Sequence, residues 1–263
     1  MNVLSLSDGI SAPRIALRKA GIPVTNYYSS ESDRFAISVS RENWTGITYL
    51  GGMDSWREWK INWAGIDLVI ITNPCAGFTI SDERISFQDP KAKAFFQFHD
   101  ILMHTRDFNP KVRFLMENTR MNKQHRGIVS NLLGVAPILI DSQLLSAQSR
   151  KRYYWCNWDV VQPHDTNQLM HTIVQNGTPH RDKSQTILPT IYKENAKSMV
   201  KRNKWGLLIK TTKGNRKLTP IECERLQNIP DNYTKILSKT QRYKTVGNSP
   251  TVDVIAHILV QIH

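Results

Sequence analysis

Short apolar runs alternate with helix-patterned segments through the first 155 residues of this 263-residue chain. Between the apolar runs, helical periodicity covers residues 11–20, 32–41 and 92–108. Such alternation predicts an α/β fold, a parallel sheet with helices packed on both faces. In folds of this type, ligands bind at the carboxyl ends of the strands. The strand-like runs are Val3–Leu6, Thr25–Ser30, Gly46–Leu50, Ile66–Thr72, Val112–Glu117 and Val135–Asp141.

The alternation is lost between residues 158 and 217, where the chain is polar, basic and rich in turns. Order returns at Thr219, which is followed by Pro220 and Glu222 in the pattern of a capped helix start. An apolar-periodic helix is predicted over 251–262. We therefore predict three parts: a catalytic and cofactor-binding domain (1–157), a small irregular lobe (158–217) and C-terminal helices that return to the first domain (218–263).

The net charge of +13 favours a polyanionic partner, most simply a nucleic acid. The charge is concentrated, because residues 160–217 hold eleven Lys or Arg and only three Asp or Glu. A solvated basic surface without a partner is the structural alternative.

Several classes of protein are disfavoured by composition. No apolar run approaches the roughly 20 residues that span a bilayer, and the N-terminus lacks the pattern of a signal peptide. The three cysteines, Cys75, Cys156 and Cys223, form no CxxC motif. We therefore expect a cytoplasmic protein with no disulfide framework, no metal and no membrane partner. Cys156 and Cys223 are predicted to be core residues.

A thiol and a carboxylate follow two successive strand-like runs. Cys75 ends the loop after 66–72, and Glu117 ends the next apolar run. Such a pair grips a flat heterocycle, because the thiol can add to the ring while the acid protonates or hydrogen-bonds it. Further on, Arg150 and Arg152 alternate with other residues in a strand-like pattern that places both on one face. That arrangement suits phosphate contact and support of an acid, and a basic edge strand is the alternative.

The first strand-like run leads into an Asp8-Gly9 turn and then a helix. Such a turn exposes backbone N–H groups that can hold an anion. Glu31 ends the second run, 22 residues after Gly9, where a carboxylate suits the two hydroxyls of a ribose. The absence of a GxGxxG motif disfavours a dinucleotide. A helix-capping or surface acid remains the alternative for Glu31.

In their order along the chain, these motifs resemble the cytosine-C5 DNA methyltransferases from end to end. The catalytic domain of the animal de novo enzymes is the nearest likeness, and a bacterial or phage enzyme is expected. The matching motifs are Asp8-Gly9, Glu31, Pro74-Cys75, Glu117-Asn118, Gln148-x-Arg150-x-Arg152, Leu218-Thr219-Pro220-x-Glu222-x-x-Arg225-Leu226-Gln227-x-x-Pro230-Asp231-x-Tyr233, and Gly247-Asn248-Ser249.

The resemblance implies a Rossmann-like sheet, S-adenosylmethionine as methyl donor (leaving S-adenosylhomocysteine), and double-stranded DNA as substrate. Cys75 would add to C6 of a cytosine flipped out of the duplex, at a cost of roughly a few kcal/mol. Glu117 would hold N3 and the exocyclic amine, with Arg150 and Arg152 supporting it. Restriction–modification is the implied setting.

The resemblance also assigns binding residues. It implies cofactor contacts at Asp8, Gly9, Ile10, Ser11, Ala12, Glu31, Ser32, Met53, Asp54, Asn248 and Ser249. It makes residues 160–217 the target-recognition region, with phosphate-contact candidates Arg181, Lys183, Lys201, Arg202 and Lys204. Four places depart from the family pattern. Ser7 replaces an aromatic residue, and Gly52 replaces an acid for which Asp54 is the proposed substitute. Asn73-Pro74 stands where the family has Ser-Pro or Pro-Pro, and Ala12-Pro13 replaces a usual glycine.

The motifs leave other hypotheses open. A tRNA-methylating branch of the family shares them, and Phe78-Thr79 after the Pro-Cys loop fits that branch. A second alternative is a DNA-binding relative with weak or no catalysis. A third is transfer of a group other than methyl from a modified cofactor.

Overall fold

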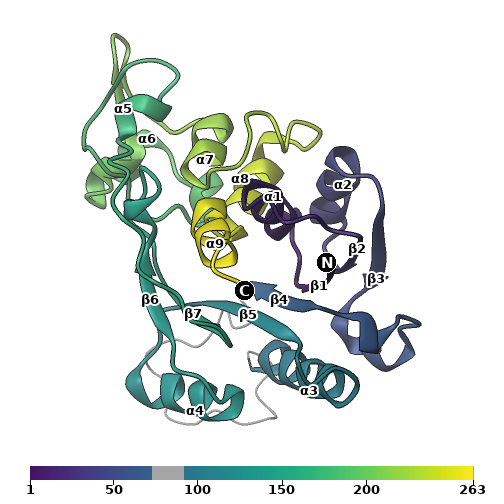
Figure 1. The fold of residues 1–263 in the computed structure, drawn as a ribbon. Helices are drawn as coiled ribbons and strands as arrows, with labels where there is room; N and C mark the ends of the chain where they lie inside the picture. The colour runs from purple at the N-terminus through teal and green to yellow at the C-terminus, as the bar shows by residue number, and fades with distance from the viewer. Residues whose placement is uncertain (73–91, 263) are drawn as a thin grey trace.

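The computed structural model describes residues 1–72 and 92–262, and their centre is a seven-stranded sheet (Figure 1). The strand order is β3-β2-β1-β4-β5-β7-β6. Strand β7 is antiparallel to both β5 and β6, whereas β1 to β5 pair in parallel. The bounds are β1 (Asn2–Leu6), β2 (Asn26–Ser30), β3 (Ile47–Gly51), β4 (Leu68–Thr72), β5 (Arg113–Thr119), β6 (Ile138–Asp141) and β7 (Lys151–Cys156).

Helices cover both faces of the sheet, so the predicted α/β class is confirmed. Helices α1 (Ala12–Lys19), α2 (Arg34–Asn43) and α9 (Val252–Leu259) pack on one face. Helices α3 (Lys93–Phe108) and α4 (Lys123–Leu133) cover the other face (Figure 1). The strands feed both cores by alternation, with Val3 of β1 on the first face and Leu4 and Leu6 on the second.

The sequence predicted a parallel sheet, but one strand of the observed sheet, β7, is antiparallel to its neighbours. The run containing Arg152 forms β7, which lies between β5 and β6 rather than at an edge, so the edge-strand alternative is wrong. The capped helix start is confirmed in α7 (Pro220–Leu226), where the Thr219 side chain accepts from the Glu222 N–H and the Glu222 side chain accepts from the Thr219 N–H.

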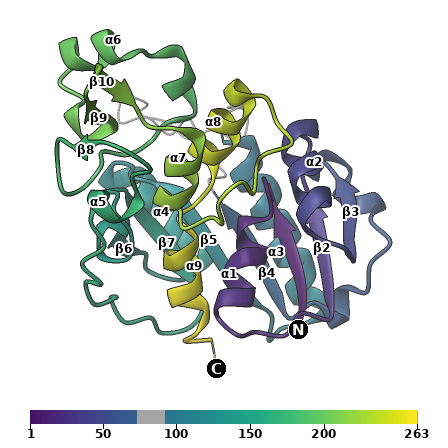
Figure 2. The ribbon, with the colours of Figure 1, turned by 90° about the horizontal axis from the view of Figure 1, so that it is seen from above.

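The basic lobe has a small sheet of its own, in the strand order β10-β9-β8. Figure 2 shows α7 and α8 (Lys239–Asn248) between this lobe and the helices α1 and α2. Short helices connect the lobe's strands. Its elements are α5 (Met170–Ile173), β8 (Thr178–Pro179), the 3-10 helix η4 (Pro189–Lys193), α6 (Ala196–Lys201), β9 (Leu208–Thr211) and β10 (Gly214–Lys217).

Three further observations concern the cysteines, membrane-spanning helices and metal sites. Cys156 and Cys223 are buried, as predicted, and burial raises the pKa of both thiols, that of Cys156 to about 11. In the described part of the chain, no helix is long and apolar enough to cross a membrane. The same residues contain no cluster of His, Cys, Asp and Glu that could hold a metal ion.

Candidate active site

A pocket lies at the carboxyl ends of β1, β2 and β4, where the strand order reverses between β1 and β4. The loop after β1 forms one wall. Ser7 and Ser11 adopt positive φ angles of 48° and 59°, which non-glycine residues rarely do. The pocket is lined by Ser7, Asp8, Gly9, Ile10, Glu31, Asp33, Ala36, Thr72, Thr245, Asn248, Ser249 and Pro250.

The buried carboxylate of Asp8 holds this loop in shape. It accepts hydrogen bonds from four hydroxyls, those of Ser5, Ser11 and Tyr27 at 2.6 Å and that of Ser29 at 2.8 Å. Burial raises the pKa of Asp8, and the four hydroxyl donors oppose that rise. We call these four hydroxyls the cage around Asp8. The hydrogen bond from Ser11 to the buried Asp8 carboxylate offsets the cost of the left-handed conformation of Ser11.

Glu31 closes the pocket from the end of β2. One carboxylate oxygen accepts from the Gly9 N–H at 2.8 Å, and the other accepts from the N–H groups of Ser32 and Asp33 at 2.8 Å each. A carboxylate has about four lone-pair sites, so Glu31 retains acceptor capacity toward the pocket. A side chain at Gly9 would meet no atom within 4 Å and would project into open space.

The carboxyl-terminal end of α8, with the residues that follow it, forms another wall of the pocket. At Gly247, a Cβ atom would lie 2.5 Å from the Pro189 nitrogen, so only glycine lets α8 approach η4 this closely. The close approach fixes the following Asn248 and Ser249 at the pocket.

The structure brings together most, but not all, of the predicted cofactor residues. Asp8, Gly9, Ile10, Glu31, Asn248 and Ser249 line the pocket, whereas Ser11 and Ala12 are buried behind it. Ser32, Met53 and Asp54 do not line it. Asp54 is exposed, and its carboxylate contacts Lys93 and Gln97 of α3. The pocket residues that sequence reasoning missed are Asp33, Ala36, Thr72, Thr245 and Pro250.

Glu117 lies at the end of β5 and is 1% exposed. Its carboxylate is 3.1 Å from Nε of Arg152, but the two groups are not aligned as a hydrogen bond. Both Glu117 oxygens are buried, and neither has a hydrogen-bond partner among the described residues. Buried charges are normally hydrogen-bonded, so within the described residues this carboxylate keeps both oxygens available for a further partner.

Arg150 makes backbone contacts that the sequence did not predict. Its two terminal nitrogens donate to the carbonyls of Ile187 and Ser249, both at 3.2 Å. Burial and the charge of Arg152 lower the pKa of Arg150 to about 10, so it stays protonated at neutral pH. The charge of Glu117 acts to raise that pKa, so the predicted support of Glu117 by Arg150 stays a prediction. In the described part of the chain, the ion pair with Glu117 is therefore made by Arg152, while Arg150 ties the lobe to the pocket turn.

The predicted nucleophile, Cys75, lies outside the described residues. The strand before it ends at Thr72, which lines the pocket and pairs directly with Glu117 in the sheet. The pocket and the Glu117 carboxylate therefore lie at neighbouring strand ends.

Comparison with known proteins identifies the family. A family model described as C-5 cytosine-specific DNA methylase matches residues 1–134 and 139–263. The chain belongs to this family. The resemblance inferred from the motifs is thereby confirmed, and the chain is a member of a family of DNA cytosine-C5 methyltransferases.

Individual relatives agree with this methylase assignment. The chain is 25% identical to the type II methyltransferase M.HhaI of Haemophilus parahaemolyticus, over 100% of this chain and 94% of that protein. It is 25% identical to the type II methyltransferase M1.ScrFI of Lactococcus lactis subsp. cremoris, over 99% and 78% respectively. The bacterial relatives fit the expected origin.

Solved structures share the fold. A mutant DNMT2 of Spodoptera frugiperda superimposes with a TM-score of 0.68 at 18% identity, covering 100% of this chain and 99% of that one. The methyltransferase EhMeth of Entamoeba histolytica gives a TM-score of 0.72 at 16% identity, covering 98% and 96%.

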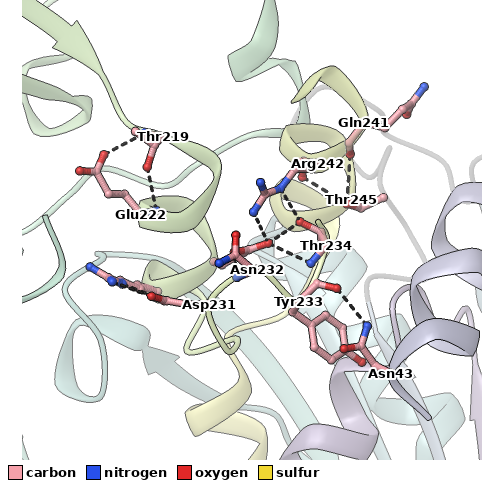
Figure 3. A network of polar contacts seen from close by, with 12 residues as sticks. Asn43, Thr219, Glu222, Asp231, Asn232, Tyr233, Thr234, Gln241, Arg242 and Thr245 are labelled. Carbon is pink, nitrogen blue, oxygen red and sulfur yellow. Dashed lines mark hydrogen bonds and ion pairs between the residues drawn. The ribbon is translucent and has the colours of Figure 1, made fainter. Parts of the chain in front are cut away.

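The long methylase motif at residues 218–233 is structural in this chain. Figure 3 shows Arg242, Thr234 and Asn232 gathered around one centre and Tyr233 turned toward Asn43. Glu224 is that centre, accepting from the N–H groups of Asn232 and Thr234 and from Arg242.

Tyr233 links this network to the pocket. Its hydroxyl donates to the Ile10 carbonyl at 2.9 Å and accepts from the Trp44 indole at 2.7 Å. Its own carbonyl accepts from Asn43 at 2.9 Å. The motif therefore holds the pocket loop from behind.

The five phosphate-contact candidates divide into two groups. Lys183 donates to three carbonyls, those of Gln143, Ser146 and Gln168, which occupies all its donors. Lys204 is paired with Glu194. Arg181, Lys201 and Arg202 are exposed on the lobe, with Arg202 at 3.7 Å from Glu194.

Proposed function

We propose that this protein transfers a methyl group from S-adenosylmethionine to C5 of cytosine in double-stranded DNA. Family membership supports the reaction class. The observation that carries the proposal is Glu117, whose two buried oxygens lack hydrogen bonds among the described residues. A cytosine edge offers two matching groups, N3 and the exocyclic amine, and the carboxyl can meet both at once.

The pocket residues fit the proposed cofactor. Glu31 offers a carboxylate of the kind that accepts hydrogen bonds from ribose hydroxyls, and Gly9 leaves open space that a side chain would fill. Asn248 and Ser249 supply polar groups on another wall of the pocket. When bound here, S-adenosylmethionine supplies an electrophilic methyl group. The chain's contribution is to hold it at the strand ends beside Glu117.

The role of Cys75 follows from the same reaction. Cytosine C5 is a poor nucleophile until a thiolate adds to C6, which moves electron density to C5. The ring becomes negatively charged when the thiolate adds. A protonated Glu117 that donates to N3 would stabilise that negative charge, while its second oxygen accepts from the amine. After methylation, loss of the C5 proton to a base allows the C6–sulfur bond to break and returns the Cys75 thiolate. The base must leave the helix to reach these groups.

Arg181, Lys201 and Arg202 remain the proposed phosphate contacts of the lobe. Their exposed positions support this role. Lys183 and Lys204 are better explained as parts of the fold, because their ammonium groups already have partners. A bacterial or phage restriction–modification setting in the cytoplasm is part of the proposal and is supported by the type II relatives.

The test is direct. The purified protein is incubated with S-adenosylmethionine and either duplex DNA or tRNA, and methylated nucleosides are quantified by mass spectrometry. We expect 5-methyldeoxycytidine with the wild type and none with Cys75→Ala. Product in tRNA alone would contradict the assigned substrate, and no product on either would contradict the assigned activity.

A further inference from the structure

Four lysines gather where the recognition lobe meets helix α8. They are Lys193 at the end of η4, Lys217 at the end of β10, and Lys239 and Lys244 on α8; together they form the seam patch. Two tyrosines lie among them. The ammonium groups of Lys193 and Lys244 are each 5.8 Å from the ring centre of Tyr192, and that of Lys217 is 4.8 Å from the ring of Tyr243.

The patch is positively charged without local compensation. Lys193, Lys239 and Lys244 are exposed, and none has an ion pair within the part of the chain that the structure describes. Glu194, next to Lys193 in sequence, pairs with Lys204 and Arg202 instead. Lys217 donates to the carbonyls of residues 191, 192 and 194, and burial followed by the charge of Lys239 lowers its pKa.

Like charges held together without acids are costly unless an anion joins them. The aromatic rings stabilise the ammonium groups by cation–π attraction. They also orient the lysines before any partner arrives. This differs from a lysine that is free in solvent on all sides.

The seam leads directly away from the candidate active site. Arg150 contacts its inner end through Ile187 and Ser249. From there, the 187–193 segment runs along α8, with Gly247 against Pro189 and Lys244 against Tyr192. At 1.5 Å per helical residue, Lys244 and Lys239 lie about 7 Å and 15 Å from Ser249 along the helix axis.

We propose that the seam patch binds the DNA backbone next to the target cytosine, through Lys193, Lys239 and Lys244. One strand of a duplex carries a phosphate about every 3.4 Å of helix axis, so about 15 Å of seam can follow several phosphates. The inference rests on the proposed function and adds a contact surface distinct from Arg181, Lys201 and Arg202. Lys217 is not one of the proposed contacts, because its ammonium group already donates to the carbonyls of residues 191, 192 and 194.

The test compares the salt dependence of DNA binding among three variants. The probe is a labelled duplex carrying the cytosine site that the wild type methylates, and the variants are Lys193→Gln/Lys239→Gln/Lys244→Gln, the same triple to Arg, and Lys60→Gln/Lys111→Gln. Lys60 and Lys111 are exposed and precede β4 and β5, so they lie toward the amino ends of these strands, whereas the pocket lies at the carboxyl ends. Each lost phosphate contact lowers the slope of log K against log salt by about 0.9.

We expect the slope of the variant with three Gln substitutions to be smaller in magnitude than that of the wild type by about two to three. The variant with three Arg substitutions and the control pair should keep the wild-type slope. A Gln triple with the slope of the control pair would overturn the proposal. Equal losses in the Gln and Arg triples would also overturn it, because they would show that charge is not what binds. A loss seen with tRNA but not with the duplex would overturn the choice of DNA. Absence of methylation by the wild type would instead count against the proposed function.

Discussion

Two regions of this molecule bury carboxylates in opposite ways. At the end of β5, Glu117 is 1% exposed, and neither oxygen has a hydrogen bond within the described residues. On α7, Glu222 and Glu224 are 0% exposed and fully engaged. Glu222 accepts from the N–H groups of Thr219 and Gln175 and from two nitrogens of Arg216.

The difference separates structural from functional charges. A buried charge with all its partners fixes the elements around it, as Glu224 does for the 231–234 loop and for α8. A buried charge left without hydrogen bonds costs stability, and we propose that for Glu117 the substrate supplies the missing partner. On this view, mutations in the two regions should affect different quantities.

The largest expected effect is on catalysis at Glu117, whose carboxylate has no hydrogen bond within the described residues. Glu117→Gln keeps the side chain's size and can still donate to N3 and accept from the amine, but an amide cannot transfer a proton to N3. We expect single-turnover methyl transfer to slow by about 10²- to 10⁴-fold, the usual contribution of a positioned acid. Rapid-quench assays with saturating DNA and cofactor measure this. Methyl transfer at the wild-type rate would contradict the role given to Glu117.

The matched change on α7, Glu224→Gln, should lower the free energy of unfolding. Glu224→Gln leaves the partly buried Arg242 without its counter-charge, and the cost of breaking a fully buried pair, about 3–5 kcal/mol, is the upper bound. Urea unfolding followed by circular dichroism gives the free energy of unfolding. If Glu117→Gln destabilised the protein more than Glu224→Gln, the distinction between the two regions would be lost.

The pH dependence of stability sharpens the same contrast. Burial alone would raise the pKa of Glu222, but hydrogen bonds from Arg216, Thr219 and Gln175 outweigh it and hold the pKa below its ordinary value. The unfolded chain then binds the proton more readily, so this stabilisation is present above about pH 4.3 and is lost as pH falls toward the folded-state pKa. Unfolding midpoints measured from about pH 6 down to about pH 2 should fall less steeply in Glu222→Gln than in the wild type.

Asp231 provides a control for that titration. The hydrogen bond from Arg225 also lowers the pKa of Asp231, but its side chain is 44% exposed. Surface ion pairs contribute little, so Asp231→Asn should change the acid sensitivity less than Glu222→Gln does. The reverse order would contradict the importance given to burial.

The smallest expected effect concerns the link between the two regions. Tyr233→Phe removes the hydroxyl that holds Ile10 in the pocket loop, at a cost of about 0.5–1.5 kcal/mol. The KM for S-adenosylmethionine should rise several-fold while kcat changes little. Tyr243→Phe is a matched control, because it loses a bond to the Leu218 carbonyl without touching the pocket. Equal KM values for the two variants would show that Tyr233 does not position the loop.

The features that sequence could predict were those set by local pattern. Strand ends are visible as the last residues of apolar runs, and parallel strands bring those ends to one edge. Glu31, Glu117 and the Asp8-Gly9 turn could therefore be assigned to a common edge before any contact was known. The capped start of α7 was equally local, because Thr219 and Glu222 are three residues apart.

What sequence could not predict depends on distant partners. The cage around Asp8 needs Tyr27 and Ser29 from the next strand. Arg150 and Arg152 are alike in sequence, yet one contacts carbonyls 37 and 99 residues away and the other contacts Glu117. Charge alone likewise could not show that Lys183 is occupied by three carbonyls while Arg181 is exposed.

The central claim is that Cys75 attacks a cytosine held by Glu117, and trapping the adduct tests it most directly. In a duplex with 5-fluorodeoxycytidine at the methylated site, the C5 position carries fluorine instead of the proton that must leave, so the thiol adduct cannot break down. After incubation with S-adenosylmethionine, denaturation and proteolysis, mass spectrometry locates the nucleotide on the chain. We predict a stable adduct on the peptide containing Cys75, formed far more slowly by Glu117→Gln. No adduct, or one on the buried Cys156 or Cys223, would contradict the account.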